Sequence, residues 1–323
     1  MPSLGAAALI FVAAGDLGDV LPSVSVVDGR RRSRYKLSRM ALNLSSQGLR
    51  RTRILYFAAV LLTLSSLFAS GCRESKVAPS TIGVFRGGQW FVDLNDNGAW
   101  DGKGIDRAFA FGGAGDVPVV GDWNGSGKVS VGVFKDGQWR LDLNGNLAWD
   151  GPAGGDRQIT FGAAGDIPVV GHWEGGSAAR VGVFRDGVWL LDVNGNGVWD
   201  GPGGGDKSLM FGEAGDLPVV GDWNGSGKTN IGVYRKGLWL LDVNGNGTWD
   251  GPAGGDQVLR FGDPGDLPVV GRWNNSATSR IGTFRKGQWF LDANGNGNWD
   301  AVAGGDRLFT FGASGDLPVA GKF

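Results

Sequence analysis

The chain is poor in the residues that most metal centres, disulfide scaffolds and charge-driven partners require. Its 323 residues include one Cys, one His and three Met. A single Cys excludes a disulfide framework, and one Cys with one His excludes a zinc site of the Cys/His type. Lys and Arg total 31 against 32 Asp and Glu, so net charge gives no case for nucleic acid as a partner. Gly and Trp are abundant instead, with 61 and 14 copies.

Long apolar runs are also missing, apart from one near the N-terminus. Three arginines within residues 50–53 precede an uncharged stretch, 54–68. About 20 apolar residues are needed to cross a bilayer, so a cleaved secretory signal is a better interpretation than a permanent membrane helix. Met40 would start a signal of ordinary length. We therefore expect residues 1–39 to be an upstream extension or disordered, and residues 40–71 to be the signal peptide.

The chain's only Cys follows directly after three small residues, 69–71. This Ala-Ser-Gly-Cys ending resembles the lipobox of bacterial lipoproteins. The resemblance implies lipid attachment at Cys72, a tether over residues 72–80, and a membrane contact through that lipid only. It also implies a bacterial cell-envelope protein at the outer membrane or cell surface, because Arg73 replaces the Asp that tends to retain such proteins at the inner membrane. The alternative is an ordinary free Cys beside a secretory signal.

Residues 81–323 consist of five copies of one unit of about 50 residues. Asp-x-Pro blocks repeat at the same period, and all 14 Trp fall at three positions of the unit. The blocks that resemble Gly-Val-Phe are spaced by 49, 50, 50 and 50 residues, and they open at Ile82, Val131, Val181, Ile231 and Ile281. Such regular self-similarity predicts a single repeat domain.

Alternating polar and apolar residues within each unit predict strands. In the third copy the expected strands are 181–184, 188–193, 207–211 and 217–223. A lone four-stranded sheet is marginal and must stack on neighbours, and four antiparallel strands per unit of this length match a β-propeller blade. We therefore expect an all-β propeller of five four-stranded blades. The chain stops within the junction at which Thr81 starts, so the two ends together complete a ring. A linear solenoid is the alternative, and it would need atypical polar caps.

Each copy carries the motif D-x-N-x-N-G-x-x-D after a Trp-containing strand. Oxygen ligands at positions one, three, five and nine suit calcium, a hard cation that takes six to eight oxygens. A strand precedes the loop where an EF-hand has a helix, and Gly203 occupies position twelve where a Glu belongs, so we expect a later Asp to substitute. The second copy has Leu147 in place of the loop Gly and is predicted to bind most weakly. The candidate calcium ligands are Asp93, Asn95, Asn97, Asp101 and Asp106; Asp142, Asn144, Asn146, Asp150 and Asp156; Asp192, Asn194, Asn196, Asp200 and Asp206; Asp242, Asn244, Asn246, Asp250 and Asp256; and Asp292, Asn294, Asn296, Asp300 and Asp306.

A turn without metal is the alternative interpretation of these loops. Asn-Gly is a common hairpin turn, and Asp and Asn bond locally to backbone. That chemistry does not explain carboxylates at both positions one and nine in all five copies, so structural calcium is the preferred hypothesis. A second loop type has a single carboxylate, and we interpret it mainly as a turn. Its weaker candidate ligands are Asp122, Asn124, Ser126, Asp222, Asn224 and Ser226.

Several short motifs together point to a repeat family. Phe161-Gly162, the Gly165-Asp166-x-Pro168 block, the Asp-Trp-Asn-Gly loop and the Gly-Val-Phe strand resemble FG-GAP or VCBS-type repeats of bacterial surface proteins. The resemblance covers residues 81–323. It implies a propeller like that of integrin α-chains and a role in extracellular binding. The integrin-type calcium loops correspond to the weaker loops of this chain, where Ser replaces an acidic ligand.

Two further residue classes repeat around the predicted ring. The Trp residues could stack on sugar rings or fill the space between sheets, and packing is the preferred interpretation. A basic residue after each Phe could line a binding face, although a solvated or ion-paired strand end is favoured. These basic residues are Arg86, Lys135, Arg185, Arg235 and Arg285.

Five near-identical copies argue against catalysis, which needs an asymmetric set of acid, base and nucleophile. His172 with Glu174 is the one asymmetric pair in this reading, and we interpret it as a drifted turn. We expect no enzymatic activity, and instead a monomeric, calcium-stabilised, lipid-anchored propeller that recognises a glycan or a surface protein with linked weak sites. The alternatives are a secreted propeller enzyme, a lyase or hydrolase of polysaccharide, and a scaffold without a ligand beyond metal.

Overall fold

The computed structural model describes residues 10–12, 23–28, 31–36 and 79–323, and the chain divides into two units, Met1–Glu74 and Ser75–Phe323. In the first unit an antiparallel sheet of order β1-β2-β3 is formed by β1 (Ile10–Val12), β2 (Ser23–Asp28) and β3 (Arg31–Lys36). The expected signal peptide, 40–71, and Cys72 lie outside the described residues. Among the helices in the described part, none has the length and apolar character needed to span a membrane.

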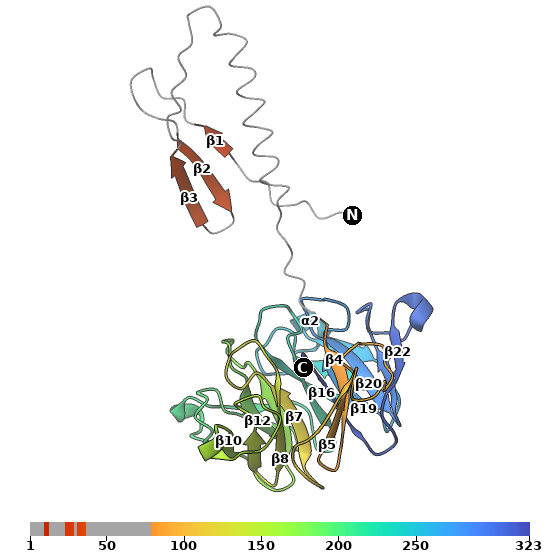
Figure 1. Ribbon diagram of the computed structural model, residues 1–323. Helices are drawn as coiled ribbons and strands as arrows, with labels where there is room; N and C mark the ends of the chain where they lie inside the picture. The colour runs from red at the N-terminus through yellow and green to blue at the C-terminus, as the bar shows by residue number, and fades with distance from the viewer. Residues whose placement is uncertain (1–9, 13–22, 29–30, 37–78) are drawn as a thin grey trace, which may run out of the picture. The chain divides into compact units, whose positions relative to one another are not determined.

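The second unit is a β-propeller of five four-stranded antiparallel blades (Figure 1). Its strands are, in chain order, β4 (Thr81–Arg86), β5 (Gln89–Val92), β6 (Arg107–Ala110), β7 (Val117–Gly121), β8 (Ser130–Lys135), β9 (Gln138–Leu141), β10 (Arg157–Thr160), β11 (Ile167–Gly171), β12 (Arg180–Arg185), β13 (Val188–Leu191), β14 (Lys207–Met210), β15 (Leu217–Gly221), β16 (Asn230–Arg235), β17 (Leu238–Leu241), β18 (Gln257–Arg260), β19 (Leu267–Gly271), β20 (Arg280–Arg285), β21 (Gln288–Leu291), β22 (Arg307–Thr310) and β23 (Leu317–Gly321). Single helical turns interrupt four loops at η1 (Pro152–Gly154), η2 (Pro202–Gly204), α2 (Gly251–Gly254) and η3 (Val302–Gly304).

The two ends of the repeat region close the ring within one blade. Blade 1 has the order β23-β4-β5-β6, so the last strand of the chain pairs with the first strand of the repeats, from Leu317 opposite Phe85 to Gly321 opposite Thr81. Blades 2 to 5 are β7–β10, β11–β14, β15–β18 and β19–β22. The predicted five-bladed ring is confirmed, and the solenoid alternative is excluded.

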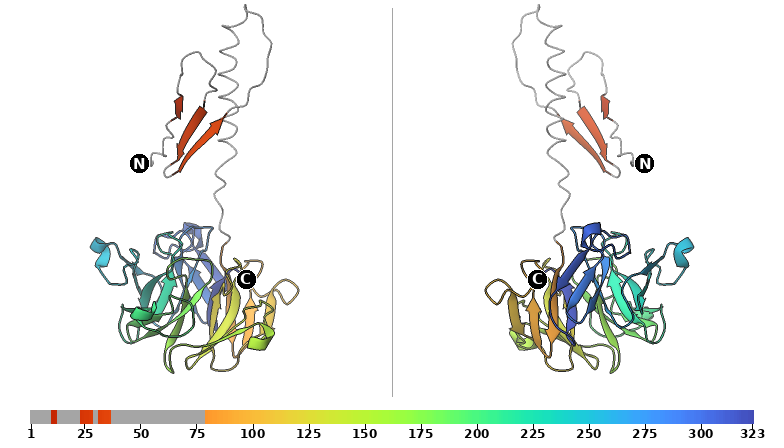
Figure 2. Two further views of the ribbon diagram at one scale, coloured as in Figure 1. Left: turned by 90° about the vertical axis from the view of Figure 1, so that its left-hand side faces the viewer. Right: turned by 90° about the vertical axis from the view of Figure 1, so that its right-hand side faces the viewer.

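The inner strand of every blade lies against the inner strands of its two neighbours, so the five inner strands surround the axis. Each blade therefore starts one strand earlier than the repeat unit cut at its Gly-Val-Phe block. Figure 2 shows the blades from two opposite sides. The inner strand is an edge strand, and Pro168 lies in β11, where a missing backbone N–H removes no ladder bond.

Tight turns join the second and third strands of every blade. In blade 3 the two turn residues, Asp186 and Gly187, both have positive φ, 49° and 89°. Such a pair defines a hairpin turn whose twist matches the flanking strands. The observed strand ends differ from the expected ones by one or two residues. For example, β13 ends at Leu191 because Asp192 already belongs to the following loop, and β15 ends at Gly221 for the same reason.

The apolar core lies between blades. Trp139 in blade 2 is fully buried and shares one cluster with Val181 and Val183 of blade 3. The same packing continues across the closing seam, where Ile82 and Val84 of blade 1 pack against the core of blade 5. Each blade buries its face only against a neighbour, so the closed ring stabilises all five blades together.

Candidate functional site

The five candidate calcium loops divide their predicted ligands into an inner and an outer group. The inner group contains the aspartates at position one and at the end of the loop, which are buried. Asp192 Oδ1 accepts a hydrogen bond from the Gly195 N–H at 2.7 Å, and its Oδ2 accepts from the Gly197 N–H at 2.9 Å. Asp206 accepts from the backbone N–H groups of Asp200 and Val193 at 2.8 and 3.1 Å. These carboxylates hold the loop backbone in shape.

The outer group contains positions three, five and nine, and it is exposed. In the third loop the Nδ2 atoms of Asn194 and Asn196 both donate to Oδ2 of Asp200, at 3.3 and 2.5 Å. The Asn194 amide also donates to the Gly204 carbonyl at 3.1 Å. Asn144 of the second loop makes the matching bond to Gly154, whereas its hydrogen bonds among the described residues do not include Asp150. Two carboxamides and one carboxylate thus converge at the surface in most loops. The spacing of the motif predicted one ligand set, whereas the structure separates these oxygens by depth.

Burial gives the inner aspartates unusual ionisation. It raises the pKa of Asp93, Asp192, Asp242 and Asp292, against the opposing effect of backbone N–H donors, and the neighbouring loop-end carboxylate raises each pKa further. One carboxylate oxygen is buried without a hydrogen-bond partner on each of three inner aspartates: Asp93, Asp156 and Asp256.

Paired buried carboxylates with an unused oxygen fit a hard divalent cation, which would neutralise the pair and occupy that oxygen. The position-one aspartate and the last aspartate would hold the ion, with further oxygens from the same loop. Within residues 79–323 no three acidic, His or Cys side chains form a metal-binding group, so carbonyl, carboxamide or water oxygens would have to complete the coordination shell.

Leu147 keeps the loop conformation that Gly has in the other copies. Its φ is 65°, close to the 80° of Gly197. A non-Gly residue pays for this left-handed conformation in strain. The second loop therefore has the same backbone path as the others, and the prediction that it binds calcium most weakly stays a prediction.

The two weaker candidate loops show ordinary turn bonding. Asp122 accepts hydrogen bonds from the backbone N–H groups of Ser126 and Gly127, and Asp222 repeats the pattern with Ser226. The Asn124 amide donates to a backbone carbonyl 3.1 Å away, and that of Asn224 does so at 2.8 Å. These bonds follow the turn interpretation.

The Trp residues fall into buried ones on or after strands and partly exposed ones in the candidate calcium loops. Those on the third strand are fully buried, and Trp189 donates its indole N–H to the Phe211 carbonyl at 2.8 Å. Those after the inner strand are buried as well. The Trp inside each candidate calcium loop packs edge-on against a Phe of the preceding blade, as Trp199 does against Phe161. Four of these loop indoles remain between 37% and 41% exposed: Trp100, Trp199, Trp249 and Trp299.

Four of the five basic residues form ion pairs, in agreement with the solvated or ion-paired strand end favoured from the sequence. Arg185 donates from Nε and Nη2 to both carboxylate oxygens of Asp166 at 2.5 and 2.8 Å, and the Asp166 side chain is completely buried. Arg86, Arg235 and Arg285 repeat the arrangement with the Asp of their own Asp-x-Pro blocks. From the sequence, the Asp of each Asp-x-Pro block was only a marker of the repeat. Its fixed distance from a basic residue in every copy was the available signal.

In blade 2 a different side chain pairs with the buried Asp of the Asp-x-Pro block. Lys135 stands where the other blades have Arg, and it reaches only a backbone carbonyl, at 3.4 Å. Arg140, at a position that is apolar elsewhere, donates to Asp116 at 2.5 Å instead. The buried Asp keeps a guanidinium partner in all five blades.

The asymmetric pair noted in the sequence does not form. Glu174 accepts from Lys207 and, at 2.9 Å, from Lys228, and these hydrogen bonds lower its pKa. His172 follows β11 directly, at the inner end of blade 3.

Searches with protein-family models, against curated proteins and against solved structures found no match.

Proposed function

We propose that this propeller is a recognition module that binds a glycan through its repeated loop sites, four of which expose a Trp. The observation that carries the proposal is the exposed loop Trp, which lies directly before the position-nine Asp in the loop that also carries the outer carboxamides. An indole offers a flat apolar face, and a neighbouring carboxylate and amides offer acceptors and donors for hydroxyl groups. Sugars present both kinds of surface.

Four such sites on one ring favour ligands that repeat. Each site is small and exposed, so its affinity for a single sugar is weak. Engagement of several sites by one polysaccharide or by a dense glycan surface raises the apparent affinity by a factor of 10² to 10⁴ without new contacts. This arrangement suits a protein held at a cell surface.

The proposal includes lipid attachment at Cys72, an envelope location at the outer membrane or cell surface, and FG-GAP or VCBS-type kinship. The motifs that support these proposals are the small-residue ending before Cys72 and the Phe-Gly, Asp-x-Pro and Gly-Val-Phe blocks. The proposal also includes structural calcium at the inner aspartates of the loops. Calcium would hold the loop that presents the Trp, and it takes no part in a reaction.

A glycan array with the full chain tests the recognition site. We expect binding to polymeric glycans, and stepwise loss as Trp199, Trp249 and Trp299 are replaced by Ala in turn. Met210→Ala is the matched control, because this apolar side chain is 79% exposed but lies on a strand outside the loops. Unchanged binding by the triple variant would refute the loop sites. Cleavage of a bound polysaccharide would favour the enzyme alternative.

Thermal unfolding tests calcium separately. Extracellular calcium modules bind with dissociation constants of about 10⁻⁴ to 10⁻³ M, so millimolar calcium is required. At a tenfold excess over the dissociation constant, each site would add about 1.4 kcal/mol to the free energy of unfolding. We expect the melting temperature to fall on adding chelator and to recover with calcium much more than with magnesium. An identical melt in chelator and in calcium would remove the metal from the proposal.

A further inference from the structure

A cavity of about 310 Å³ opens at the axis, where the five inner strands end. Its wall is formed by the residue before each terminal Gly of an inner strand, and four of these five residues are Val. Its rim is formed by the residue that follows each of those strands. The volume falls in the range of small-molecule sites.

The rim is the place where the five copies stop being equivalent. Structurally matched positions carry an acid, an imidazole, an acid, a guanidinium and an ammonium group, and the residues are Asp122, His172, Asp222, Arg272 and Lys322. From the sequence alone, His172 belongs only to a drifted turn. The topology brings all five to one opening. A rim without rotational symmetry suits one ligand in one orientation.

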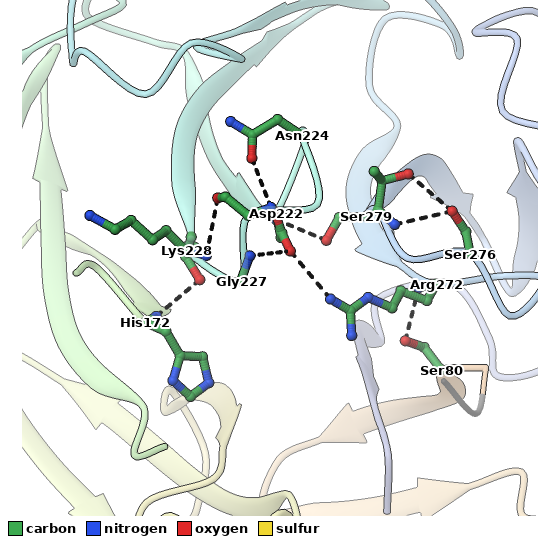
Figure 3. A network of polar contacts seen from close by, with 12 residues as sticks. Ser80, His172, Asp222, Asn224, Gly227, Lys228, Arg272, Ser276 and Ser279 are labelled. Carbon is green, nitrogen blue, oxygen red and sulfur yellow. Dashed lines mark hydrogen bonds and ion pairs between the residues drawn. The ribbon is translucent and has the colours of Figure 1, made fainter. Parts of the chain in front are cut away.

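Hydroxyl groups line only part of this cavity. Ser80, Thr229 and Ser279 each accept a hydrogen bond from the backbone N–H of a rim residue in the preceding blade, at 2.9 to 3.0 Å (Figure 3). The two remaining matched positions are Val129 and Ala179, which also line the cavity. One side of the opening is therefore polar and the other side is apolar.

The polar side has more donors than free acceptors. Asp222 already accepts from the backbone N–H groups of Ser226 and Gly227, and Asp122 is bonded within its own loop in the same way. Arg272 reaches Asp222 through one nitrogen, Nη2, at 3.5 Å, which leaves most of its N–H groups for another partner.

One other rim residue adds a donor. Lys322 lines the cavity, and within the described residues no ion pair joins it, whereas Nδ1 of His172 is buried. Figure 3 shows His172, Asp222 and Arg272 at the inner ends of three successive blades. The rim can therefore surround an anion with donors from several blades.

We propose that the axial cavity binds one small organic carboxylate. The carboxylate pairs with Arg272 and the hydroxyl side of the rim, and the aliphatic body lies along the valine wall. A guanidinium matches a carboxylate with two parallel hydrogen bonds, which fixes the orientation of the ligand. Both rim carboxylates, Asp122 and Asp222, already accept backbone hydrogen bonds, and Asp222 also faces Arg272. This site is independent of the proposed loop sites, because none of its residues lies in those loops.

Calorimetric titration of the full chain with acetate, butyrate and hexanoate tests this assignment. We expect one ligand per chain and an affinity that rises roughly fourfold for each added methylene. Hexanamide, which lacks the charge, should bind at least tenfold more weakly. Arms with glucuronate and N-acetylvaline separate the two sources of such a carboxylate, an acidic sugar and a peptide terminus, and tighter binding of either one supports the assignment.

Amino-acid substitutions test whether the axial cavity is the site of carboxylate binding. Arg272→Gln should weaken hexanoate binding about tenfold or more, and Arg260→Gln, on the exposed outer strand of blade 4, should leave it unchanged. Ser279→Ala provides a second axial variant if Arg272→Gln alters the circular-dichroism spectrum. Equal binding by the Arg272 and Arg260 variants, a stoichiometry of five, or no saturable binding of any carboxylate would overturn the proposal, and each outcome leaves the loop Trp test intact.

Discussion

The rim of the axis and the loops at the outer ends of the blades are built from the same repeat, yet they differ in how far the copies diverge. The loops keep Asp at position one, Trp before position nine and an Asp at the end in all five copies. The five rim positions share no residue type except for two aspartates. Loop residues must satisfy buried backbone groups, so each copy needs the same chemistry, whereas a rim side chain faces a cavity and can change without disturbing a ladder. The residues that repeat in every copy are therefore those that the fold requires. The rim residues that differ between copies can give a single ligand one preferred orientation.

The largest effect is expected at a close contact between two blades. Gly162 has a φ of 90°, and a Cβ there would lie 2.7 Å from a methyl carbon of Val183 in the same blade-to-blade contact. Gly162→Ala should lower the free energy of unfolding by about 3 kcal/mol, because it adds overpacking to left-handed strain. Gly165→Ala is the matched control, since Gly165 has a φ of 86° and open space around it.

Denaturant unfolding of the two variants separates the cost of overpacking from the cost of backbone strain. The Gly165 variant should lose only the strain, about 1 kcal/mol. Equal losses in the two variants would show that the close contact between blades adds nothing, and that the repeated Gly serves the turn alone.

A second, smaller effect compares blade 3 with blade 2. Arg185→Met would leave the buried Asp166 with the Ala163 N–H as its remaining donor, at 2.8 Å. We expect a loss of about 2 kcal/mol, because half of the Arg side chain is solvated and the pair is only partly shielded. Lys135→Met at the matched position should cost less than about 0.5 kcal/mol, since Lys135 does not pair with Asp116. A costly Lys135 variant would contradict the assigned exchange of partners.

Acid should weaken the same kind of ion pair. Burial tends to raise the pKa of Asp266, but hydrogen bonds from Arg285 and from the Asp263 N–H, with the charge of Arg285, lower it below its ordinary 3.8. A carboxylate with a lowered pKa in the folded state stabilises the fold above 3.8, and this stabilisation is lost as the pH falls through the lower folded-state value.

Unfolding at pH 7, 5 and 3 checks the sign of this effect. The cost of Arg285→Met should be largest at pH 7 and pH 5 and should shrink at pH 3. Arg260→Met, on an exposed outer strand, serves as the control and should show no such change. A cost for Arg285→Met that grows towards acid would contradict the assigned ion pair.

The smallest effect on stability is expected at the axis. His172→Asn and Lys322→Gln should each change the free energy of unfolding by less than about 0.5 kcal/mol, because neither side chain has a hydrogen-bond role in the ring. Thermal melts of these variants beside the wild type test this. A loss comparable with that of Gly162→Ala would mean that the rim holds the blades together and that its divergence has a structural cause.

Blade number, ring closure and strand composition could be predicted because each depends on periodicity and on the unfinished junction at Thr81 and Phe323. The blade boundary could not, since a repeat can be cut at any strand and only hydrogen bonding shows that β23 belongs with β4. The spacing of the loop motif identified the oxygen-bearing side chains but not which of them are buried. Burial depends on hydrogen bonds such as those that Asp192 accepts from backbone N–H groups of its own loop. The rim was missed because its residues lie about 50 positions apart and meet only when the ring closes.

The number of sugars bound at saturation tests the central claim most directly. Equilibrium dialysis of the full chain with the monosaccharide unit of an array-selected glycan should give four ligands per chain, one for each loop with an exposed Trp, bound with a single dissociation constant. One bound sugar per chain, or several with unrelated affinities, would contradict the claim that the repeated loops form equivalent recognition sites.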